Sequence, residues 1–246
     1  MSASAAMRTS VRSASGGVTG NAVLDRLPAS DRAALLARAV RVPIERGDVL
    51  CIARRPLGAI HFPLAGLVAL VAPVAPRPPL AVGLVGRDGM VGLLFAHDDD
   101  AGALGAVVQV DGYAWRVPAD DFAPALVRRP GVRRAVERAM HEVVAQVACT
   151  ATCLLFHEIE ERLAGWLALA AKRSPDRVLH LTHQQLADLL GVQRSAITLA
   201  TGSLQRRRLL ECTRGTIRIV DRAGLEAAGC ECRRGARPRT ASSPAR

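Results

Sequence analysis

The stretch between Leu181 and Leu210 constrains the fold most, because it holds two apolar helical runs separated by a single glycine. Thr182 is a good N-cap for the first run, "HQQLADLL". Gly191 supplies the backbone freedom for a sharp turn, and the second run, "VQRSAITLATGSLQRRR", resumes helical spacing. The pattern predicts a helix-turn-helix, a motif whose second helix enters the major groove of DNA. The inward positions are Leu186, Leu189, Leu190, Ile197, Thr201 and Leu204.

Polar side chains occupy the leading surface of the second run. All of them can donate or accept hydrogen bonds, and the pairing of arginine with guanine is the commonest specific base contact. The side chains that we predict to read base edges are Gln193, Arg194, Ser195 and Thr198.

The next segment, "LLECTRGTIRIVD", contains two short strand-like runs joined through Arg214 and Gly215, which predicts a hairpin or wing. Cations around a helix-turn-helix position the protein on the sugar-phosphate backbone, whereas base-edge contacts read the sequence. The alternative is an ordinary helical hairpin whose charges are only solvated. The predicted backbone contacts are Thr182, His183, Arg206, Arg207, Arg208 and Arg214.

The 246-residue chain has a net charge of +11, and the excess lies at its C-terminal end. Residues 204–246 contain eleven arginines and four acids, and Lys172 is the only lysine. A basic end indicates a nucleic acid or another polyanion as partner. The alternatives are a merely solvated tail and the codon preference of a GC-rich genome. Residues 233–246 are expected to form a flexible basic tail, and residues 1–20, with little to bury, a disordered N-terminus.

Short apolar runs punctuated by glycine and proline extend from Arg41 to about Asp121, among them "AIHFPL", "LVALVAP" and "AVVQVDGYAWRV". Regular short strands with turn signals between them indicate a β-sandwich or roll. Before this region, Ser30 can cap a short helix whose Leu35 and Leu36 face a core.

A long helix is predicted over residues 130–156, where the apolar residues change to a 4-3-4-3-4 spacing typical of a coiled coil. This apolar seam has to be buried, either on the β-roll of its own chain or against the same helix of a second copy. A second helix with an apolar face, "HEIEERLAGWLALAAKR", follows directly. The seam residues, which we assign to a dimer interface, are Val136, Met140, Val143, Val147, Thr150 and Leu154.

The order of these elements resembles the bacterial Crp/Fnr superfamily of transcriptional regulators over about residues 24–230. The most specific matches are "LTHQQLADLLGVQRSAITLATGSLQ", "RGTIRIVDRAGLE" and "HEIEERLAGWL", while "HFPLAGLVAL" and "VGLVGRDGMVGL" are similar to the sensory domain of the family. The resemblance implies an α+β fold with a double-stranded β-helix or jelly-roll-like β-roll over residues 21–129. It further implies a dimerisation helix over 130–156, a winged helix-turn-helix DNA-binding domain over 157–232, and a homodimer on a two-fold symmetric operator.

The chain departs from the cyclic AMP-binding members of the family at the positions that would hold the nucleotide. Those members carry a glutamate just after a glycine, whereas here Leu93 follows Gly92, and Leu104 or Gly105 stands where they carry an arginine. A buried anionic phosphate without its cation would cost several kcal/mol, so we expect no tight binding of cyclic AMP. Arg87 is close enough in sequence to be considered as a substitute cation. The candidate residues of an effector pocket are Arg87, Gly92, Leu93 and Leu104.

Two further departures concern the reading helix and the cofactor. Leu199 stands where some members carry a base-reading arginine and could contact a thymine methyl group instead, which leaves the operator sequence open. Iron–sulfur members have an N-terminal cysteine cluster, whereas this chain has no cysteine before Cys51, so no iron–sulfur cluster is expected. The sequence does not identify the effector or any cofactor.

Cysteine and histidine residues with metal-ligand spacing occur near the end of the long helix. Cys153 and His157 are four residues apart, a spacing that can bind one metal ion, and Cys149 shares their face. Small thiols inside a packed helix are more often core than ligands, and this is the interpretation that we adopt. Cys230 and Cys232 are close enough for thiol chemistry if exposed, although an incidental structural role is favoured.

The sequence thus predicts a homodimeric, cytoplasmic transcriptional regulator that binds double-stranded DNA and RNA polymerase, with a signal at the β-roll shifting the long helices. The alternative is a regulatory or scaffold β-roll that acts on a protein partner. The sequence has no nucleophile elbow, phosphate loop or two-histidine metal motif, so an enzyme is not expected. We also expect no signal peptide and no membrane span, since residues 64–85, the segment nearest to one, are interrupted by four prolines.

Overall fold

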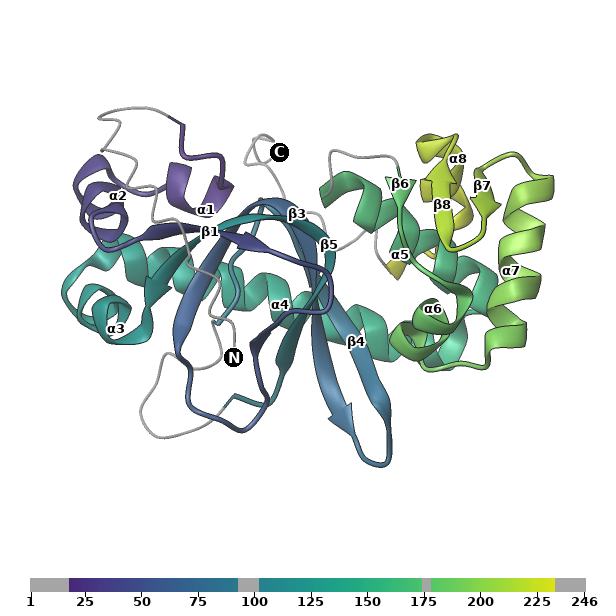
Figure 1. Cartoon of the computed structure of the whole chain (residues 1–246), viewed down its shortest axis with the longest axis horizontal. Coiled ribbons are helices and arrows are strands. Elements are labelled where there is room, and N and C mark those ends of the chain that lie inside the picture. Colours follow the sequence, from purple (N-terminus) through teal and green to yellow (C-terminus); the bar gives the residue numbers. More distant parts are fainter. Residues whose placement is uncertain (1–17, 93–101, 174–177, 233–246) are drawn as a thin grey trace, which may run out of the picture.

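The computed structural model describes residues 18–92, 102–173 and 178–232. A β-roll with short flanking helices is followed by the long helix α4 and by a smaller domain of helices around a three-stranded sheet (Figure 1). The predicted α+β fold, with an N-terminal β-roll and a C-terminal winged helix-turn-helix, is confirmed. Leu93, the basic tail 233–246 and all but three residues of the predicted disordered N-terminus lie outside the described residues.

Five antiparallel strands form the β-roll, and the two longest, β3 (Ala59–Val74) and β5 (Gly105–Pro118), pair along most of their length. The strand order is β1–β5–β3–β4, and β2 also pairs with β5. Every strand therefore attaches to the β3–β5 pair directly. The remaining strands are β1 (Val40–Ile44), β2 (Val49–Cys51) and β4 (Arg77–Val85).

β3 is one long strand where the sequence predicted two short ones, "AIHFPL" and "LVALVAP". Its pairing with β5 shifts register on both sides of Gly66, whose φ is +89°. A Cβ at Gly66 would lie 2.7 Å from the carbonyl oxygen of Val110 on β5, so only glycine fits here. The glycine marks a bulge that bends a continuous strand, and it does not end the strand.

Three helices close one end of the β-roll: α1 (Ala22–Asp25), α2 (Ala29–Leu36) and α3 (Ala119–Arg128). The predicted cap of α2 was wrong, because Pro28 occupies the N-cap and Ser30 lies inside the helix. Proline fits there since its fixed φ is compatible with a helix start and no backbone N–H is lost from the ladder.

α4 (Pro130–Phe156) covers the range predicted for the long helix, but the predicted seam is divided between two environments. Val136 and Val143 are buried in the core of the β-roll, and Met140 packs against that core. The prediction that these three face a partner chain is therefore corrected in favour of the alternative, burial on the chain's own β-roll. Thr150 donates a hydrogen bond to the carbonyl of Val82 on β4 (3.2 Å) and also faces the roll.

The second half of α4 carries an apolar face that the described residues leave uncovered. Val147 and Leu154, the last two predicted seam residues, are exposed there, as are Val144, Leu155 and Phe156. By length and composition alone α4 is apolar enough to cross a membrane, although part of it is buried in the core of the β-roll. The helix that passes this test is thus α4, and not residues 64–85, the segment that the sequence marks as nearest to a span.

The C-terminal domain begins with α5 (Ile159–Arg173), which presents Leu163, Trp166 and Leu167 to its core. The same core includes Leu67 and Leu84 from strands β3 and β4, so the two domains share buried apolar surface. The other elements are β6 (Val178–Leu179), α6 (His183–Leu190), α7 (Arg194–Arg206), β7 (Leu210–Thr213), β8 (Thr216–Ile219) and α8 (Arg222–Ala228), with strand order β6–β8–β7.

Arg173, at the end of α5, links three parts of the molecule. Its Nε donates to Asp88 Oδ2 at 3.0 Å, and its Nη1 donates to Gln146 Oε1 on α4 at 3.0 Å. Nη1 also donates to the carbonyl of Leu84 on β4. The side chain is only 11% exposed, so this arginine is a well-shielded connection between the β-roll, α4 and the C-terminal domain.

Candidate nucleic-acid interface

The turn between α6 and α7 has the local interactions that its sequence predicts. Thr182 caps α6 in a capping box: the Gln185 N–H donates to Thr182 Oγ1 (3.2 Å), and the Thr182 N–H donates to Gln185 Oε1 (2.9 Å). Gly191 ends α6 in the left-handed region, at φ +66°. The positive φ favours glycine here, and a Cβ would also lie 2.8 Å from Leu80 Cδ1 of β4, a side-chain end that would have to shift.

α7 presents two different faces. Ile197 and Leu204 are fully buried against the domain core, whereas the predicted base-reading side chains are all exposed. His183 of α6 lies beside them, with Nδ1 3.0 Å from Thr198 Oγ1. The Thr198 hydroxyl donates to the Arg194 carbonyl (3.1 Å), which is consistent with a proton on His183 Nδ1. The exposed base-reading set is Gln193, Arg194, Ser195 and Thr198.

The hairpin of β7 and β8 brings its tip to the start of α6. Gly215 at this tip has φ +77°, and a Cβ built on it would lie 3.6 Å from Thr182 Cγ2. Arg214, which precedes it, is exposed. The wing tip and the N-terminal parts of α6 and α7 therefore adjoin one another, and we call this surface the reading face. It consists of Thr182, His183, Gln193, Arg194, Ser195, Thr198 and Arg214.

Three predicted backbone contacts do not join the reading face. Arg206, Arg207 and Arg208 lie at the C-terminal end of α7, about 18 Å along the helix axis from Arg194 at 1.5 Å per residue. Arg207 pairs there with Glu160 of α5 at 2.8 Å. The run of arginines that stood out in the sequence thus lies at the end of α7 remote from Arg194.

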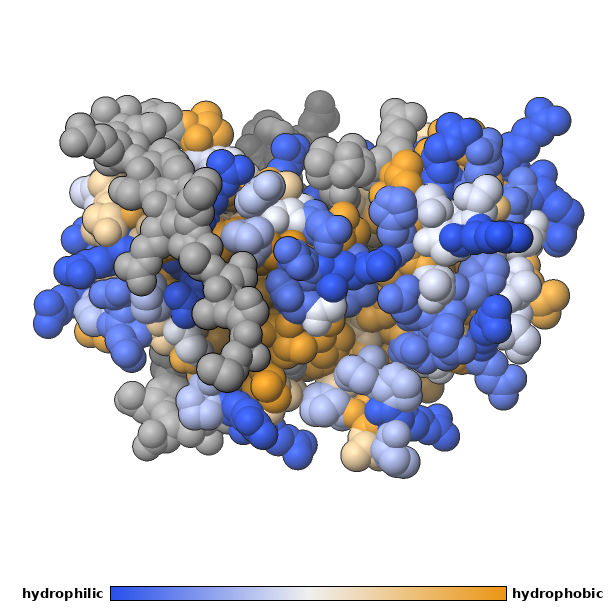
Figure 2. Space-filling view, in the orientation of Figure 1, coloured by the Kyte–Doolittle hydropathy of each residue, from blue (hydrophilic) through white to orange (hydrophobic). Residues whose placement is uncertain are grey.

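Hydrophilic side chains cover most of the surface over α6 and α7, apart from a hydrophobic spot on the outer edge of α7 (Figure 2). Leu199 of α7 is 75% exposed. Five of the eleven C-terminal arginines belong to residues 233–246, outside the described residues, so most of the local cationic excess cannot be assigned to this face.

The predicted effector positions meet mostly hydrocarbon. A Cβ on Gly92, whose φ is +103°, would lie 2.9 Å from Ile60 Cδ1. Leu104 packs against the core of the β-roll, and Arg87 is exposed. Among the described positions, the candidates therefore do not assemble a buried cationic cradle for a phosphate.

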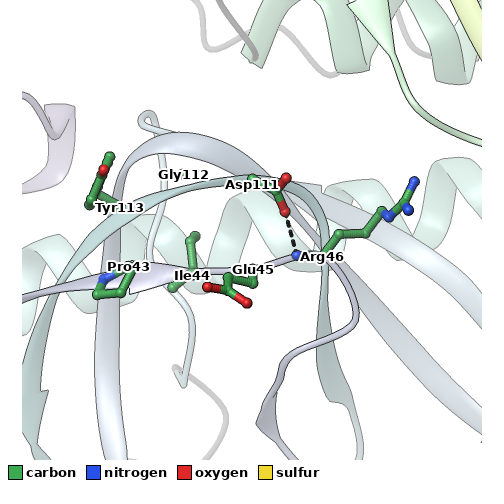
Figure 3. Close-up of a pocket in the computed structure, with 7 residues that line it drawn as sticks. All are labelled: Pro43, Ile44, Glu45, Arg46, Asp111, Gly112 and Tyr113. Carbon is green, nitrogen blue, oxygen red and sulfur yellow. Dashed lines mark hydrogen bonds between the residues drawn. The ribbon is translucent and has the colours of Figure 1, made fainter. Parts of the chain in front are cut away.

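A shallow hollow lies on the outside of the β-roll, where the chain leaving β1 passes β5 (Figure 3). The Arg46 N–H donates to Asp111 Oδ1 (2.6 Å), and its guanidinium donates to the carbonyl of His180 in the C-terminal domain (2.5 Å). The sequence offered no signal for this contact, because its partners are 134 residues apart. The hollow is lined by Pro43, Ile44, Glu45, Arg46, Asp111, Gly112 and Tyr113.

The strongly shifted pKa values belong to buried groups away from the reading face. Burial, with a smaller effect of the Arg116 charge, lowers the pKa of His61 on β3 to about 4. Burial raises the pKa of Cys51 and of Cys212 to about 11, and it also raises the pKa of Cys153. These thiols are therefore protonated at neutral pH in the absence of a bound cation.

The structure brings Cys153 and His157 at the end of α4 together with Cys230 and Cys232, which follow α8. The sequence gives no sign that the two pairs meet, because more than 70 residues lie between them. Cys149 lies one helical turn before Cys153, with the two sulfur atoms 3.8 Å apart. Cys153 and His157, which the sequence spacing marks as possible metal ligands, thus have the thiols of Cys230 and Cys232 close by.

Comparison with known proteins shows that the chain is similar to transcriptional regulators. Residues 161–228 match the model of the Crp-like helix-turn-helix domain. The chain is 22% identical over 191 residues to the global nitrogen regulator of Synechococcus elongatus, covering 74% of this chain and 86% of that protein. The fold is shared with FixK2 from Bradyrhizobium japonicum (TM-score 0.65, 15% identity, 78% and 98% of the two chains). It is also shared with a Crp/Fnr-family transcriptional regulator from Thermus thermophilus (TM-score 0.61, 22% identity, 76% and 97%). The resemblance predicted from the sequence is confirmed.

Proposed function

We propose that this chain, a Crp/Fnr-type transcriptional regulator with a helix-turn-helix DNA-binding domain, is a homodimer that reads a two-fold symmetric operator. The reading face is the observation that carries the proposal. It places one guanidinium and several hydrogen-bonding side chains at the exposed start of α7, flanked by the start of α6 and by the wing. Such a helix start presents its side chains to base edges in the major groove, while flanking groups contact phosphates.

Within this face, Arg194 is proposed to read guanine, and Gln193, Ser195 and Thr198 to read or support neighbouring bases. Leu199 is proposed to contact a thymine methyl group, which its exposure on α7 supports. Thr182, His183 and Arg214 are proposed to contact phosphates on either side. Arg206, Arg207 and Arg208 are left out of the contact surface, because they lie at the other end of α7.

The exposed apolar face of α4 is the proposed dimer interface. Leu155 and Phe156 are 77% and 75% exposed, and a second copy of the helix would bury both side chains. Val147 and Leu154 belong to the same face, and Val144 extends it toward the middle of the helix. Two chains joined along α4 would present two reading faces, which must lie about 34 Å apart to enter successive major grooves.

A signal at the β-roll is proposed to change this spacing. The shared core and the Arg173 contacts connect the roll, α4 and the C-terminal domain, so a shift of one is transmitted to the others. The effector is proposed not to be cyclic AMP, because Gly92 and Leu104 adjoin hydrocarbon and the exposed Arg87 supplies no buried cation. The chain would act in the cytoplasm, by binding and not by catalysis, with RNA polymerase as a further partner.

Selection of duplexes from random DNA, followed by gel-shift titration across a salt series, tests the reading face. Arg194→Ala is expected to lose about 1–3 kcal/mol of discrimination between the selected duplex and its variants. Arg206→Ala, on the same helix, is the matched control and is expected to bind like the parent. Equal discrimination by the Arg194→Ala variant and the parent, or binding only to a protein partner and to no duplex, would contradict the proposal.

Sedimentation equilibrium tests the dimer. Leu155→Glu is expected to convert the dimer to a monomer, because a charge in a buried helix pair is costly. Val127→Glu is the control, since Val127 of α3 is equally exposed and lies away from the α4 face. A monomeric parent, or a dimer that survives the Leu155 change, would show that α4 does not join two copies.

A further inference from the structure

Three thiols gather where the end of α4 meets the end of the C-terminal domain. The sulfur atoms of Cys153, Cys230 and Cys232 all lie within 4.8 Å of one another. Cys153 and Cys230 are buried, and their sulfur atoms are 3.1 Å apart, beyond the roughly 2.05 Å of a disulfide bond. These are free thiols that lie close enough together to share one ion.

His157, the C-cap of α4, places a ring nitrogen beside Cys232 of this group. Its Nε2 lies 3.2 Å from Cys232 Sγ, and its Nδ1 lies 3.2 Å from Glu161 Oε2. A carboxylate that accepts the proton of one ring nitrogen leaves the lone pair of the other nitrogen free toward a metal, which is the usual arrangement behind a metal-binding histidine. The Glu158 N–H donates to the same Glu161 oxygen at 3.2 Å and holds the carboxylate in place.

We infer that Cys153, Cys230, Cys232 and His157 bind a single zinc-class divalent ion. A tetrahedral ion with bonds of about 2.3 Å to sulfur holds its sulfur ligands roughly 3.8 Å apart, within an ångström of the separation seen between Cys153 and Cys230. Three thiolates and one imidazole form a standard closed structural zinc site, and soft ligands in this geometry select zinc over magnesium or calcium. A multi-iron cluster fits less well, because iron and sulfide atoms would push the thiols further apart.

The ion would fasten the end of the DNA-binding domain to the base of α4. Cys153 and His157 come from α4 and its cap, whereas Cys230 and Cys232 lie beyond residue 228, where the match to the helix-turn-helix family ends. The exposed Leu154, Leu155 and Phe156 lie between the two α4 ligands in the chain. The ion would therefore hold the C-terminal domain beside the proposed dimer face, and its binding does not depend on the chain recognising DNA.

Metal analysis of the full-length chain, purified without chelators from zinc-supplemented cells, tests this inference. About one zinc per chain is expected in the parent. Cys153→Ser and Cys232→Ser are expected to lose it, whereas Cys51→Ser and Cys212→Ser, whose thiols lie outside the group, are expected to keep it. Because Cys153 is in the core, Cys232→Ser, which changes a half-buried residue, keeps the test valid if the Cys153 variant misfolds.

Two further readouts identify the ligands. Replacement of zinc by Co²⁺ should give thiolate-to-cobalt charge-transfer bands that weaken in Cys232→Ser and persist in His157→Asn. Glu161→Gln, which removes only the carboxylate behind His157, is expected to weaken zinc binding about 10–100-fold in competition with a chromophoric chelator. A parent that contains no zinc and takes up no Co²⁺ would overturn the inference. Equal zinc content in Cys232→Ser and Cys212→Ser, or iron with acid-labile sulfide in the parent, would also overturn it.

Discussion

The β-roll and the C-terminal domain differ in the polar side chains at their candidate sites, although both domains bury some polar groups, such as His61 and Thr201. The C-terminal domain exposes polar side chains along the starts of α6 and α7, where Arg194 and Thr198 face solvent. The β-roll buries His61 and Gln109 and surrounds Gly92 with hydrocarbon. An exposed polar surface suits a large external polyanion, whereas the described part of the roll offers no comparable cradle for a small anion.

The contrast in surfaces does not extend to the cores, because the two domains are joined by buried apolar contacts. Leu67 and Leu84 of the roll pack in one cluster with Trp166 and Leu167 of α5. A domain whose core continues into its neighbour cannot unfold or rotate without exposing shared surface. The two domains are therefore joined by packing, although their surfaces carry different chemistry.

The largest expected effect tests this continuity. Leu84→Ala, at a side chain that is 1% exposed, is expected to lower the free energy of unfolding by about 2–5 kcal/mol. Because the cluster spans both domains, urea unfolding followed by far-UV circular dichroism should remain a single transition. Val127→Ala, at an exposed site, should change little. Two separate transitions, with only the roll destabilised, would show that the domains are independent.

The buried His61 of the roll should make stability depend on pH. Its pKa is about 4 in the folded chain against about 6.5 when unfolded, so the unfolded state binds the extra proton between these values. Stability should therefore fall as pH drops from about 6.5 to 4, by up to roughly 3 kcal/mol. His61→Asn should flatten this dependence, and His141→Asn, at an exposed site, should preserve it. Unfolding curves at several pH values measure both, and an unchanged dependence in His61→Asn would refute the assignment.

The capping box of α6 provides a test of stability within the C-terminal domain. Thr182→Ala removes the side-chain acceptor for the Gln185 N–H and is expected to cost about 1 kcal/mol of stability. Thermal unfolding measures this loss, with Thr152→Ala on α4 as a control that leaves no helix cap broken. If both variants melt alike, the capping box contributes nothing to the domain.

The smallest expected effect separates the two ends of the winged domain. Arg214→Ala at the wing tip should weaken binding to all duplexes and reduce the slope of log affinity against log salt by about 1. Arg206→Ala, at the far end of α7, should leave the slope unchanged. Gel-shift titrations at four or five salt concentrations measure both slopes. The reverse result would move the phosphate contacts to the run of arginines after α7.

Elements held by short-range interactions were predictable from sequence. The Thr182 cap, the left-handed Gly191 and the wing turn at Gly215 depend on residues within a few positions of one another, so a local pattern contains the needed information. The same reasoning located the exposed start of α7. It failed at Gly66, because a glycine in an apolar run can end a strand or bend it, and only the partner strand decides which.

What the sequence determined by itself is the series of elements and the face that each must bury, since periodicity and capping are properties of neighbouring residues. What only the tertiary structure decided is which surface covers each face. The seam of α4 is buried on the β-roll at Val143 and exposed at Leu154, although its spacing is the same in both places. Arg173, the contacts of Arg46, and the meeting of Cys153 with Cys230 likewise depend on segments far apart in the chain, whose approach is set by packing of the whole molecule.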